Sequence, residues 1–216
     1  IDRLVSAKGR LLDFGCAAGI FLEVALDDGW QVAGVELSSH MAARASTRLG
    51  VVVAPTLDDL LGEFDVVTMW EVVEHLPRPL ETLKDIHNRM RHGGVLVMST
   101  PNTGHWLAQQ TPDAWEGYRP PSHLTFFGGE SLSFTLREAG FRDVVVRRTA
   151  PSPPLPEPIR SRTRSLRLGV VNADVHPLWL ALYAWRVIRL FGIVWQRVFQ
   201  PGLDIYATLV VSARRP

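Results

Sequence analysis

The first hundred residues alternate short apolar runs with amphipathic stretches, and no other feature of the chain constrains its fold as strongly. Strand-length apolar runs are predicted at residues 10–14, 31–36, 51–54, 64–69 and 95–99. Helices are predicted between them at residues 19–26, 39–49 and 79–90, with Gly93-Gly94 ending the last one. Strands that alternate with helices form parallel sheets covered by helices on both faces. The pattern therefore predicts an α/β protein with a doubly wound sheet.

The second hundred residues are less regular. Residues 101–129 are rich in proline, glycine and aromatic residues and are predicted to form a long loop, a kind of segment that is usually functional in a compact domain. Residues 150–158 carry too many prolines for regular structure. The remaining elements are predicted as a helix at 130–139, a strand at 142–149, a long aromatic helix at 177–200 and a strand at 203–213.

The composition fits a single domain spanning residues 1–216, with residues 150–200 forming a proline- and arginine-rich linker and helical insert. Of the 216 residues, 46% are hydrophobic and 21% charged, and the formal net charge of +1 gives no general case for a nucleic-acid partner. Cys16 is the only cysteine and no apolar leader precedes the first strand, which favours a cytoplasmic protein. Because the chain does not begin with methionine, we expect the natural N-terminus further upstream.

A glycine-containing turn follows the first predicted strand and marks a candidate cofactor site. Gly15 and Gly19 allow a sharp turn and a close approach of a ligand to the backbone, next to the free N–H groups of a helix N-terminus. Asp13 stands at the carboxyl end of the strand, where ligands bind in open α/β sheets. Glu36 ends the second strand, about 20 residues on, where an acidic group meets ribose hydroxyls. These residues predict a nucleotide-type cofactor.

Two residues in the turn argue against a dinucleotide. The dinucleotide fingerprint needs glycines at positions 15, 17 and 20, but this chain has Ala17 and Ile20. The carboxylate of Asp13 would also repel a pyrophosphate, whereas it suits the ammonium group of S-adenosylmethionine. An NAD-dependent oxidoreductase, a non-catalytic binding scaffold and an RNA methyltransferase stay open as alternatives.

Two longer segments carry a resemblance to a known family. Residues 11–38 (LLDFGCAAGIFLEVALDDGWQVAGVELS) and residues 64–102, which include the element EHL-x-x-P at 74–79, resemble the motifs of class I S-adenosylmethionine-dependent methyltransferases. That element is typical of the group containing ubiquinone-biosynthesis O-methyltransferases and small-molecule or saccharide methyltransferases. The resemblance implies a Rossmann-like sheet of order 3-2-1-4-5-7-6 with strand 7 antiparallel. It also implies methyl transfer from S-adenosylmethionine, giving S-adenosylhomocysteine, to a small-molecule acceptor, most simply a hydroxyl of a quinone-like, lipid-linked or saccharide compound.

The same resemblance implies roles for individual residues. Asp13, Gly15 and Gly19 would line the methionine part of the cofactor, and Glu36 would hold the ribose. The residues implied around the rest of the cofactor are Leu37 beside the adenine, Thr56 and Leu57 at the adenine edge, Trp70 near the methionine end and Cys16 as packing. The family usually has glycine at position 17, and we expect Ala17 to be tolerated if the backbone there avoids positive φ.

The acceptor side is predicted from histidines and aromatic residues. The segment 115–127 (WEGYRPPSHLTFF) resembles an element found among saccharide and cell-surface modifiers. His123 is predicted as the catalytic base or a substrate contact, with a structural role as the alternative. His75, His105, Trp115 and Tyr118 are predicted substrate contacts. No metal is expected, because the histidines are scattered along the sequence and no carboxylate cluster has ligand spacing.

The predicted helix at 177–200 has several interpretations. Its tryptophans and arginines suit a peripheral membrane contact, whereas its apolar length suits burial over the sheet edge or a homodimer interface. If the helix lies near the acceptor, we expect Trp179 and Tyr183 to face the pocket. The arginine-rich run at 160–167 is either a solvated loop or a binder of an acidic head group.

Overall fold

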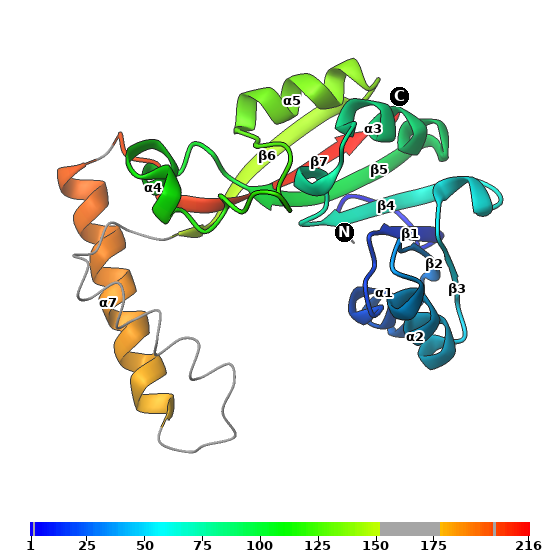
Figure 1. Ribbon diagram of the computed structural model, residues 1–216, viewed down its shortest axis with the longest axis horizontal. Helices are drawn as coiled ribbons and strands as arrows, with labels where there is room; N and C mark the ends of the chain where they lie inside the picture. Colours follow the sequence, from blue (N-terminus) through cyan, green and yellow to red (C-terminus); the bar gives the residue numbers. More distant parts are fainter. Residues whose placement is uncertain (2, 152–177, 201) are drawn as a thin grey trace.

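The computed structural model describes residues 1, 3–151, 178–200 and 202–216, and its centre is one seven-stranded sheet. The strand order is β3-β2-β1-β4-β5-β7-β6, and β7 runs antiparallel to both of its neighbours (Figure 1). The predicted fold class is therefore confirmed. The strands are β1 Arg10–Phe14, β2 Gln31–Val35, β3 Val52–Ala54, β4 Phe64–Trp70, β5 Met90–Pro101, β6 Arg142–Pro151 and β7 Tyr206–Arg214.

The register of the sheet brings the ends of the parallel strands to one edge. Phe14 pairs with Val35 between β1 and β2, and Asp13 pairs with Thr68 between β1 and β4. The turns after β1, β2 and β4 therefore leave the sheet side by side. In open α/β sheets this carboxyl edge is where ligands bind.

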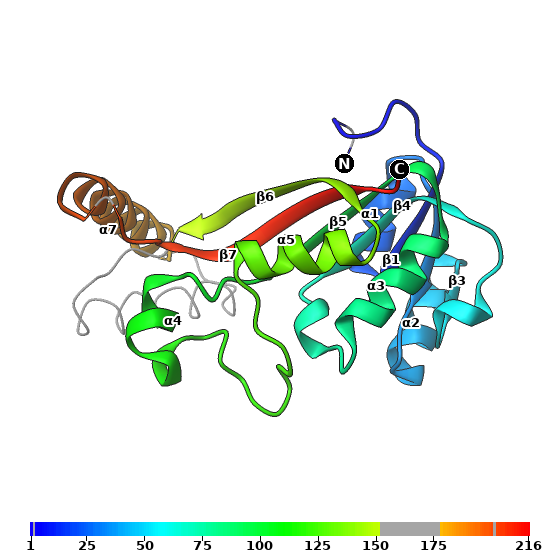
Figure 2. The same ribbon diagram turned by 90° about the horizontal axis from the view of Figure 1, so that it is seen from above.

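Helices cover the sheet through two apolar clusters. The helices are α1 Ile20–Asp27, α2 Ser39–Leu49, α3 Pro79–Asn88, α4 Trp106–Gln110, α5 Gly129–Glu138 and α7 Leu178–Phe199, with short 3-10 turns at Leu57–Asp59, Val73–His75 and Pro112–Ala114. The larger cluster includes Leu83 of α3 and Leu132 of α5. The helices α3 and α5 lie on the same face of the sheet (Figure 2). The smaller cluster packs Ala25 of α1 and Trp30 against Leu11. The core thus fixes the carboxyl edge from both sides.

Three predictions about the elements are corrected. Gly93 and Gly94 do not end a helix: α3 ends at Asn88, and both glycines lie inside β5, which starts at Met90. The pairing of β4 with β5 shifts register between Phe64 and Val66, so the extra residues around the glycines are accommodated as an irregularity in the strand. The predicted loop at 101–129 also contains α4 and a 3-10 turn.

The helix α7 lies at the end of the molecule away from β1–β3 (Figure 1). The interpretation that this helix is buried in the core is wrong for its second half. Several large apolar side chains between residues 187 and 199 are at least half exposed. The side chains of Trp179 and Tyr183, and all of residues 152–177, lie outside what the structure describes. Within the described residues, no helix has the length and apolar character needed to cross a membrane.

Candidate functional site

The turn after β1 has the backbone conformation that its glycines predict. Gly15 has a φ of 81° and Gly19 a φ of 78°, both in the left-handed region. A Cβ atom on Gly15 would lie 2.5 Å from Cγ2 of Val72, so the position also has no room for a side chain. The N–H groups of Gly15 and Cys16 donate to the carbonyl of Val35, at 2.8 and 3.1 Å. The turn is thereby fastened to the end of β2.

The condition set for an unstrained Ala17 is not met. Its φ is 47°, so the alanine lies in the left-handed region. This conformation costs an L-residue with a Cβ roughly 1 kcal/mol. The N–H of Ala17 donates to Oε2 of Glu36 at 2.9 Å, and the N–H of Ser38 donates to Oε1 of the same carboxylate at 2.8 Å. Glu36 therefore holds the turn in its strained shape.

A second carboxylate, that of Asp13, is buried at the same edge. Its side chain is 2% exposed and its Oδ1 accepts a hydrogen bond from Thr68 Oγ1 at 2.7 Å. Burial raises the pKa of Asp13 to about 6, against the smaller lowering effect of the Thr68 hydrogen bond. Burial, with the charges of Asp13 and Glu36, also raises the pKa of the Cys16 thiol to about 12. A buried thiol with a raised pKa stays protonated, which favours the predicted packing role of Cys16 over a nucleophilic one.

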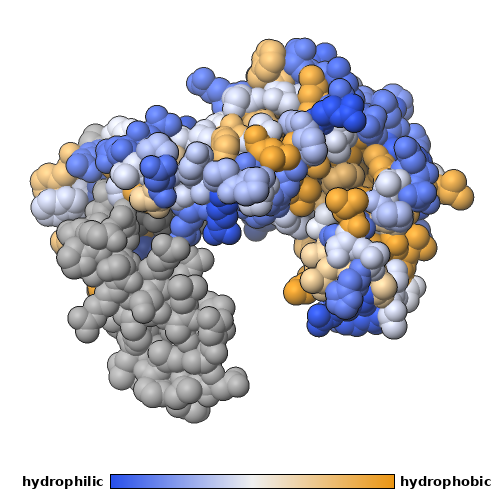
Figure 3. Space-filling model, in the orientation of Figure 1, coloured by the Kyte–Doolittle hydropathy of each residue, from blue (hydrophilic) through white to orange (hydrophobic). Residues whose placement is uncertain are grey.

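The residues predicted around the adenine and the methionine end lie at the ends of β2, β3 and β4. Leu37 is 87% exposed, Thr56 Oγ1 donates to Asp59 Oδ2 at 2.7 Å, and Leu57 is buried. Trp70 is half-buried, and its ring meets Phe21 edge-on with centroids 5.3 Å apart. In the space-filling view, apolar residues gather between the part containing α1 and α2 and the part containing α3 (Figure 3). All the predicted cofactor residues therefore border one edge.

Two histidines meet on the acceptor side. The rings of His75 and His123 pack edge to face with centroids 4.7 Å apart. His75 Nδ1 lies 2.7 Å from the carbonyl of Ser122, and His123 Nδ1 lies 2.7 Å from the carbonyl of Gly117. A carbonyl only accepts, so in both rings Nδ1 carries the proton and donates it. The lone pair of each neutral ring is therefore on Nε2.

Glu74 joins these histidines and was missed by the sequence analysis as a functional residue. Its carboxylate is buried, with Oε2 accepting from Thr100 Oγ1 at 3.0 Å. Among the described residues, Oε1 is buried and has no hydrogen-bond partner. Burial raises the pKa of Glu74, and the charge of Glu71 adds to the effect. The backbone carbonyl of Glu74 accepts from the N–H groups of Leu124 and Thr125, which holds the segment after His123 against it.

The three side chains form a cluster that their positions along the chain do not predict. Glu74, His75 and His123 each offer a ligand atom, and these atoms all lie within 4.8 Å of one another. Two imidazoles whose Nδ1–H groups are held by carbonyls, plus one carboxylate, are a set that binds divalent transition metals. The partnerless Oε1 of Glu74 fits this role. The assumption that the histidines are scattered is therefore corrected, because the fold brings two of them together.

The other predicted acceptor residues differ in exposure. His105 is 2% exposed and caps α4, its Nδ1 accepting from the N–H of Leu107. Trp115 is buried in a cluster with Trp106, Leu107 and Ile205. Tyr118 is 44% exposed, with its ring 5.7 Å from that of Phe126. His105 and Trp115 are thus buried, whereas Tyr118 is accessible.

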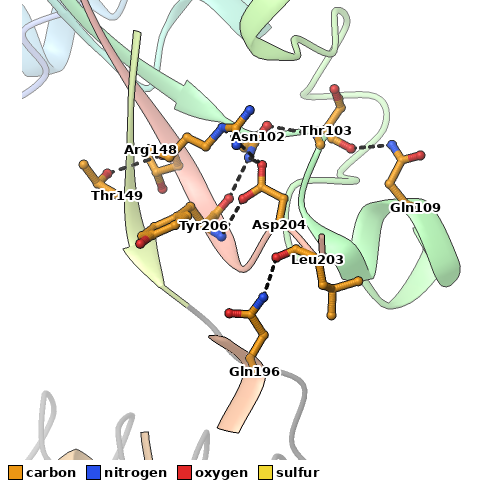
Figure 4. Close-up of polar contacts among 11 residues, drawn as sticks. Asn102, Thr103, Gln109, Arg148, Thr149, Gln196, Leu203, Asp204 and Tyr206 are labelled. Carbon is orange, nitrogen blue, oxygen red and sulfur yellow. Dashed lines mark hydrogen bonds and ion pairs between the residues drawn. The ribbon is translucent and has the colours of Figure 1, made fainter. Parts of the chain in front are cut away.

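A polar network connects the loop after β5 to β7 and α7 (Figure 4). The amide of Asn102 donates to Asp204 Oδ2 at 3.0 Å and to the carbonyl of Tyr206 at 2.7 Å. Asp204 also pairs with Arg148 of β6 at 3.4 Å. Gln196 of α7 donates to the carbonyl of Leu203 at 2.8 Å. The loop after β5, the start of β7 and α7 are therefore joined.

Comparisons with known proteins agree with this geometry. A family model described as a methyltransferase domain matches residues 1–146. The ubiquinone biosynthesis O-methyltransferase of Xanthomonas axonopodis pv. citri (strain 306) is 30% identical over 191 residues, covering 79% of this chain and 76% of that protein. Its namesake from Pseudomonas aeruginosa (strain LESB58) is 32% identical over 111 residues, covering 47% of this chain and 48% of the relative. The chain thus spans about half the length of several curated relatives it matches.

Solved structures show the same fold. A S-adenosylmethionine-dependent methyltransferase from Archaeoglobus fulgidus superimposes with a TM-score of 0.66 at 22% identity, covering 98% of this chain and 88% of that one. The family match covers more than half of the chain, and the strand order is the one that the resemblance implied. The chain therefore belongs to the methyltransferase domain family and has the fold of the class I S-adenosylmethionine-dependent methyltransferases.

Proposed function

We propose that this protein transfers a methyl group from S-adenosylmethionine to a hydroxyl of a quinone-like, lipid-linked or saccharide acceptor. One observation carries the proposal: the buried carboxylate of Asp13 and the clamping carboxylate of Glu36 border the same glycine turn. Asp13 pairs with the cofactor ammonium, and Glu36 accepts from the ribose hydroxyls. The backbone of Gly15, Cys16 and Gly19 lies against the methionine part. The remaining proposed cofactor contacts are Leu37, Thr56, Leu57 and Trp70.

Methyl transfer is an in-line displacement at the sulfonium carbon, and its main requirement is that the acceptor oxygen be held in line with the sulfur. S-adenosylmethionine supplies the methyl group and leaves as S-adenosylhomocysteine. His123 takes the proton of the acceptor hydroxyl on Nε2, while its Nδ1–H stays with the Gly117 carbonyl. His75 and Tyr118 contact the acceptor, and His105 and Trp115 support them. The names of the curated relatives support a hydroxyl as the acceptor.

A test of the cofactor uses Glu36. In Glu36→Ala we expect S-adenosylhomocysteine to bind roughly 10- to 100-fold more weakly in calorimetry, because a hydrogen bond to a charged group contributes about 1.5–3 kcal/mol. Glu81→Ala, which removes an exposed carboxylate that pairs with Arg78, should leave the affinity unchanged. Binding of NAD with no response to S-adenosylhomocysteine would overturn the proposal in favour of an oxidoreductase. Cofactor binding without turnover on any hydroxyl acceptor would favour the non-catalytic scaffold.

The cluster of Glu74, His75 and His123 favours a second mode of acceptor activation. The sequence predicted no metal, but these three groups fit a divalent transition metal ion. Such an ion would stabilise the anionic form of the acceptor oxygen. After treatment with a chelator, we expect titration with Zn²⁺ or Mn²⁺ to give about one equivalent bound, lost in Glu74→Gln. His40→Ala, which removes an exposed histidine outside the cluster, is the control. If no metal binds at concentrations up to about 1 mM, catalysis by His123 as a base is the remaining mode of activation.

A further inference from the structure

The second half of α7 presents a row of large apolar side chains to solvent. This outer face consists of seven residues that are each between 50% and 66% exposed: Val187, Leu190, Phe191, Val194, Trp195, Val198 and Phe199. Their spacing of three and four places them on one side of the helix. The rings of Phe191 and Trp195 have centroids 6.1 Å apart, and those of Trp195 and Phe199 have centroids 4.2 Å apart. An exposed apolar face of this size marks an interaction surface.

The opposite side of the same helix is packed and hydrogen-bonded, which fixes the direction of the outer face. Gly192 and Gln196 are buried, and Ile193 packs against the cluster that contains Trp115. The side chain of Gln196 donates to the carbonyl of Leu203 at 2.8 Å (Figure 4). It also donates to the carbonyl of Gln200 at 2.7 Å. The outer face therefore points away from the rest of the described chain and does not pack against the sheet.

The charge of the surrounding sequence indicates what covers this face. Residues 159–200 contain seven arginines and one aspartate, whereas the remainder of the chain contains 16 basic and 21 acidic side chains. The formal net charge of the whole chain is only +1, because the basic segment and the acidic remainder nearly cancel. Aromatic residues beside a concentration of arginines are typical of helices that lie in the interface of an anionic membrane. A second copy would instead bring two equally basic segments together in a symmetric contact.

We infer that the outer face of α7 docks on an anionic lipid surface, with the helix lying along the membrane plane. Ile193 joins α7 to the cluster of Trp106, Leu107, Trp115 and Ile205 on the acceptor side. Docking would therefore bring the acceptor side of the site to the bilayer. A consequence that rests on the proposed function is that the acceptor is itself membrane-borne, which narrows the three acceptor classes to lipid-linked or prenylated compounds.

The test is co-sedimentation with vesicles, which needs no turnover. We expect the protein to bind vesicles containing about one third phosphatidylglycerol more tightly than vesicles of pure phosphatidylcholine. The affinity for the anionic vesicles should rise roughly fivefold for each arginine that lies near their surface. The double variant Phe191→Glu/Trp195→Glu should bind at least about tenfold more weakly. The matched control is Leu61→Glu/Phe134→Glu, which makes the same charge change at side chains that are 85% and 64% exposed elsewhere. The control should bind like the unaltered protein.

Three outcomes would overturn the inference. The first is that the protein does not bind anionic vesicles, and the second is that both double variants lose vesicle binding equally. The third is that the unaltered protein is a dimer that does not bind vesicles, and that Phe191→Glu/Trp195→Glu converts this dimer to a monomer in sedimentation velocity. The last result would assign the outer face to a second copy. An outer face covered by residues 152–177 would give the first result. Calorimetry with S-adenosylhomocysteine on the same variants separates this failure from failure of the proposed function, because cofactor binding should be equal in all of them.

Discussion

Asp13→Asn is expected to stabilise the free protein at neutral pH while weakening its binding of S-adenosylhomocysteine. The buried carboxyl has a pKa of about 6 against its ordinary value of 3.8, so keeping it ionised at pH 7.5 costs about 3 kcal/mol. Asparagine is neutral, and its oxygen accepts from Thr68 as the carboxylate does. We therefore expect the melting temperature to rise by roughly 6–12 °C, at about 2–4 °C per kcal/mol for a chain of this length. Calorimetry should show product affinity falling roughly 100-fold, because a buried ion pair loses one partner.

The pH dependence of Asp13 has a definite sign. A carboxyl whose pKa is raised on folding contributes stability that is fully present below its unfolded pKa and is lost as the pH rises through its folded pKa. The stability advantage of Asp13→Asn should therefore grow between about pH 4 and pH 6 and stay constant above that. Below pH 6 the unaltered protein should lose product affinity, whereas Asp13→Asn should bind with the same affinity from pH 5 to pH 7. An Asp27→Asn control, at an exposed acid of α1, should show neither change. Equal affinity in Asp13→Asn and the unaltered protein would remove Asp13 from the site.

The parts of the fold that follow from local pattern were predictable. The strands from β1 to β4 combine an apolar run with a neighbouring turn signal, and their predicted bounds differ from the observed ones by a residue at most. The start of β5 was not predictable, because Met90 joins the sheet by pairing with Phe64, and that pairing overrides the turn tendency of Gly93-Gly94. At this position the strand pairing outweighs the local turn preference of the two glycines.

The cofactor edge was more predictable than the acceptor side for a physical reason. Asp13 lies next to the last residue of β1, and Gly15 and Glu36 directly follow β1 and β2, so their meeting depends only on strand order. The cluster of Glu74 and His123 depends instead on how a long loop folds back, through backbone hydrogen bonds from Leu124 and Thr125 to the Glu74 carbonyl. Nothing in the spacing of these residues shows those bonds. The strain at Ala17 was equally hidden, because φ there is set by the turn and by the Glu36 carboxylate rather than by the residue itself.

His123→Ala is expected to lower kcat by about 100-fold or more while leaving the affinity for S-adenosylhomocysteine unchanged. The reason is geometric: the Gly117 carbonyl holds Nδ1–H, so Nε2 keeps the lone pair, and His123 belongs to the same cluster as Glu74 and His75. Whether that lone pair takes the acceptor proton or binds a metal, its removal acts on turnover and not on the turn that holds the cofactor.

The measurement is S-adenosylhomocysteine formation with a panel of catechol, prenylated phenol and sugar acceptors, using His40→Ala as the control at an exposed histidine. Partial recovery of His123→Ala by added imidazole, without metal, would assign the role of base, because a small base replaces a proton acceptor but not a fixed ligand set. Recovery only on addition of Zn²⁺ or Mn²⁺ would assign the role of ligand. A kcat equal to that of the unaltered protein on its best acceptor would contradict both roles. It would reduce His123 to a residue that holds the loop through Gly117, and Glu74 and His75 would then be the groups left to activate the hydroxyl.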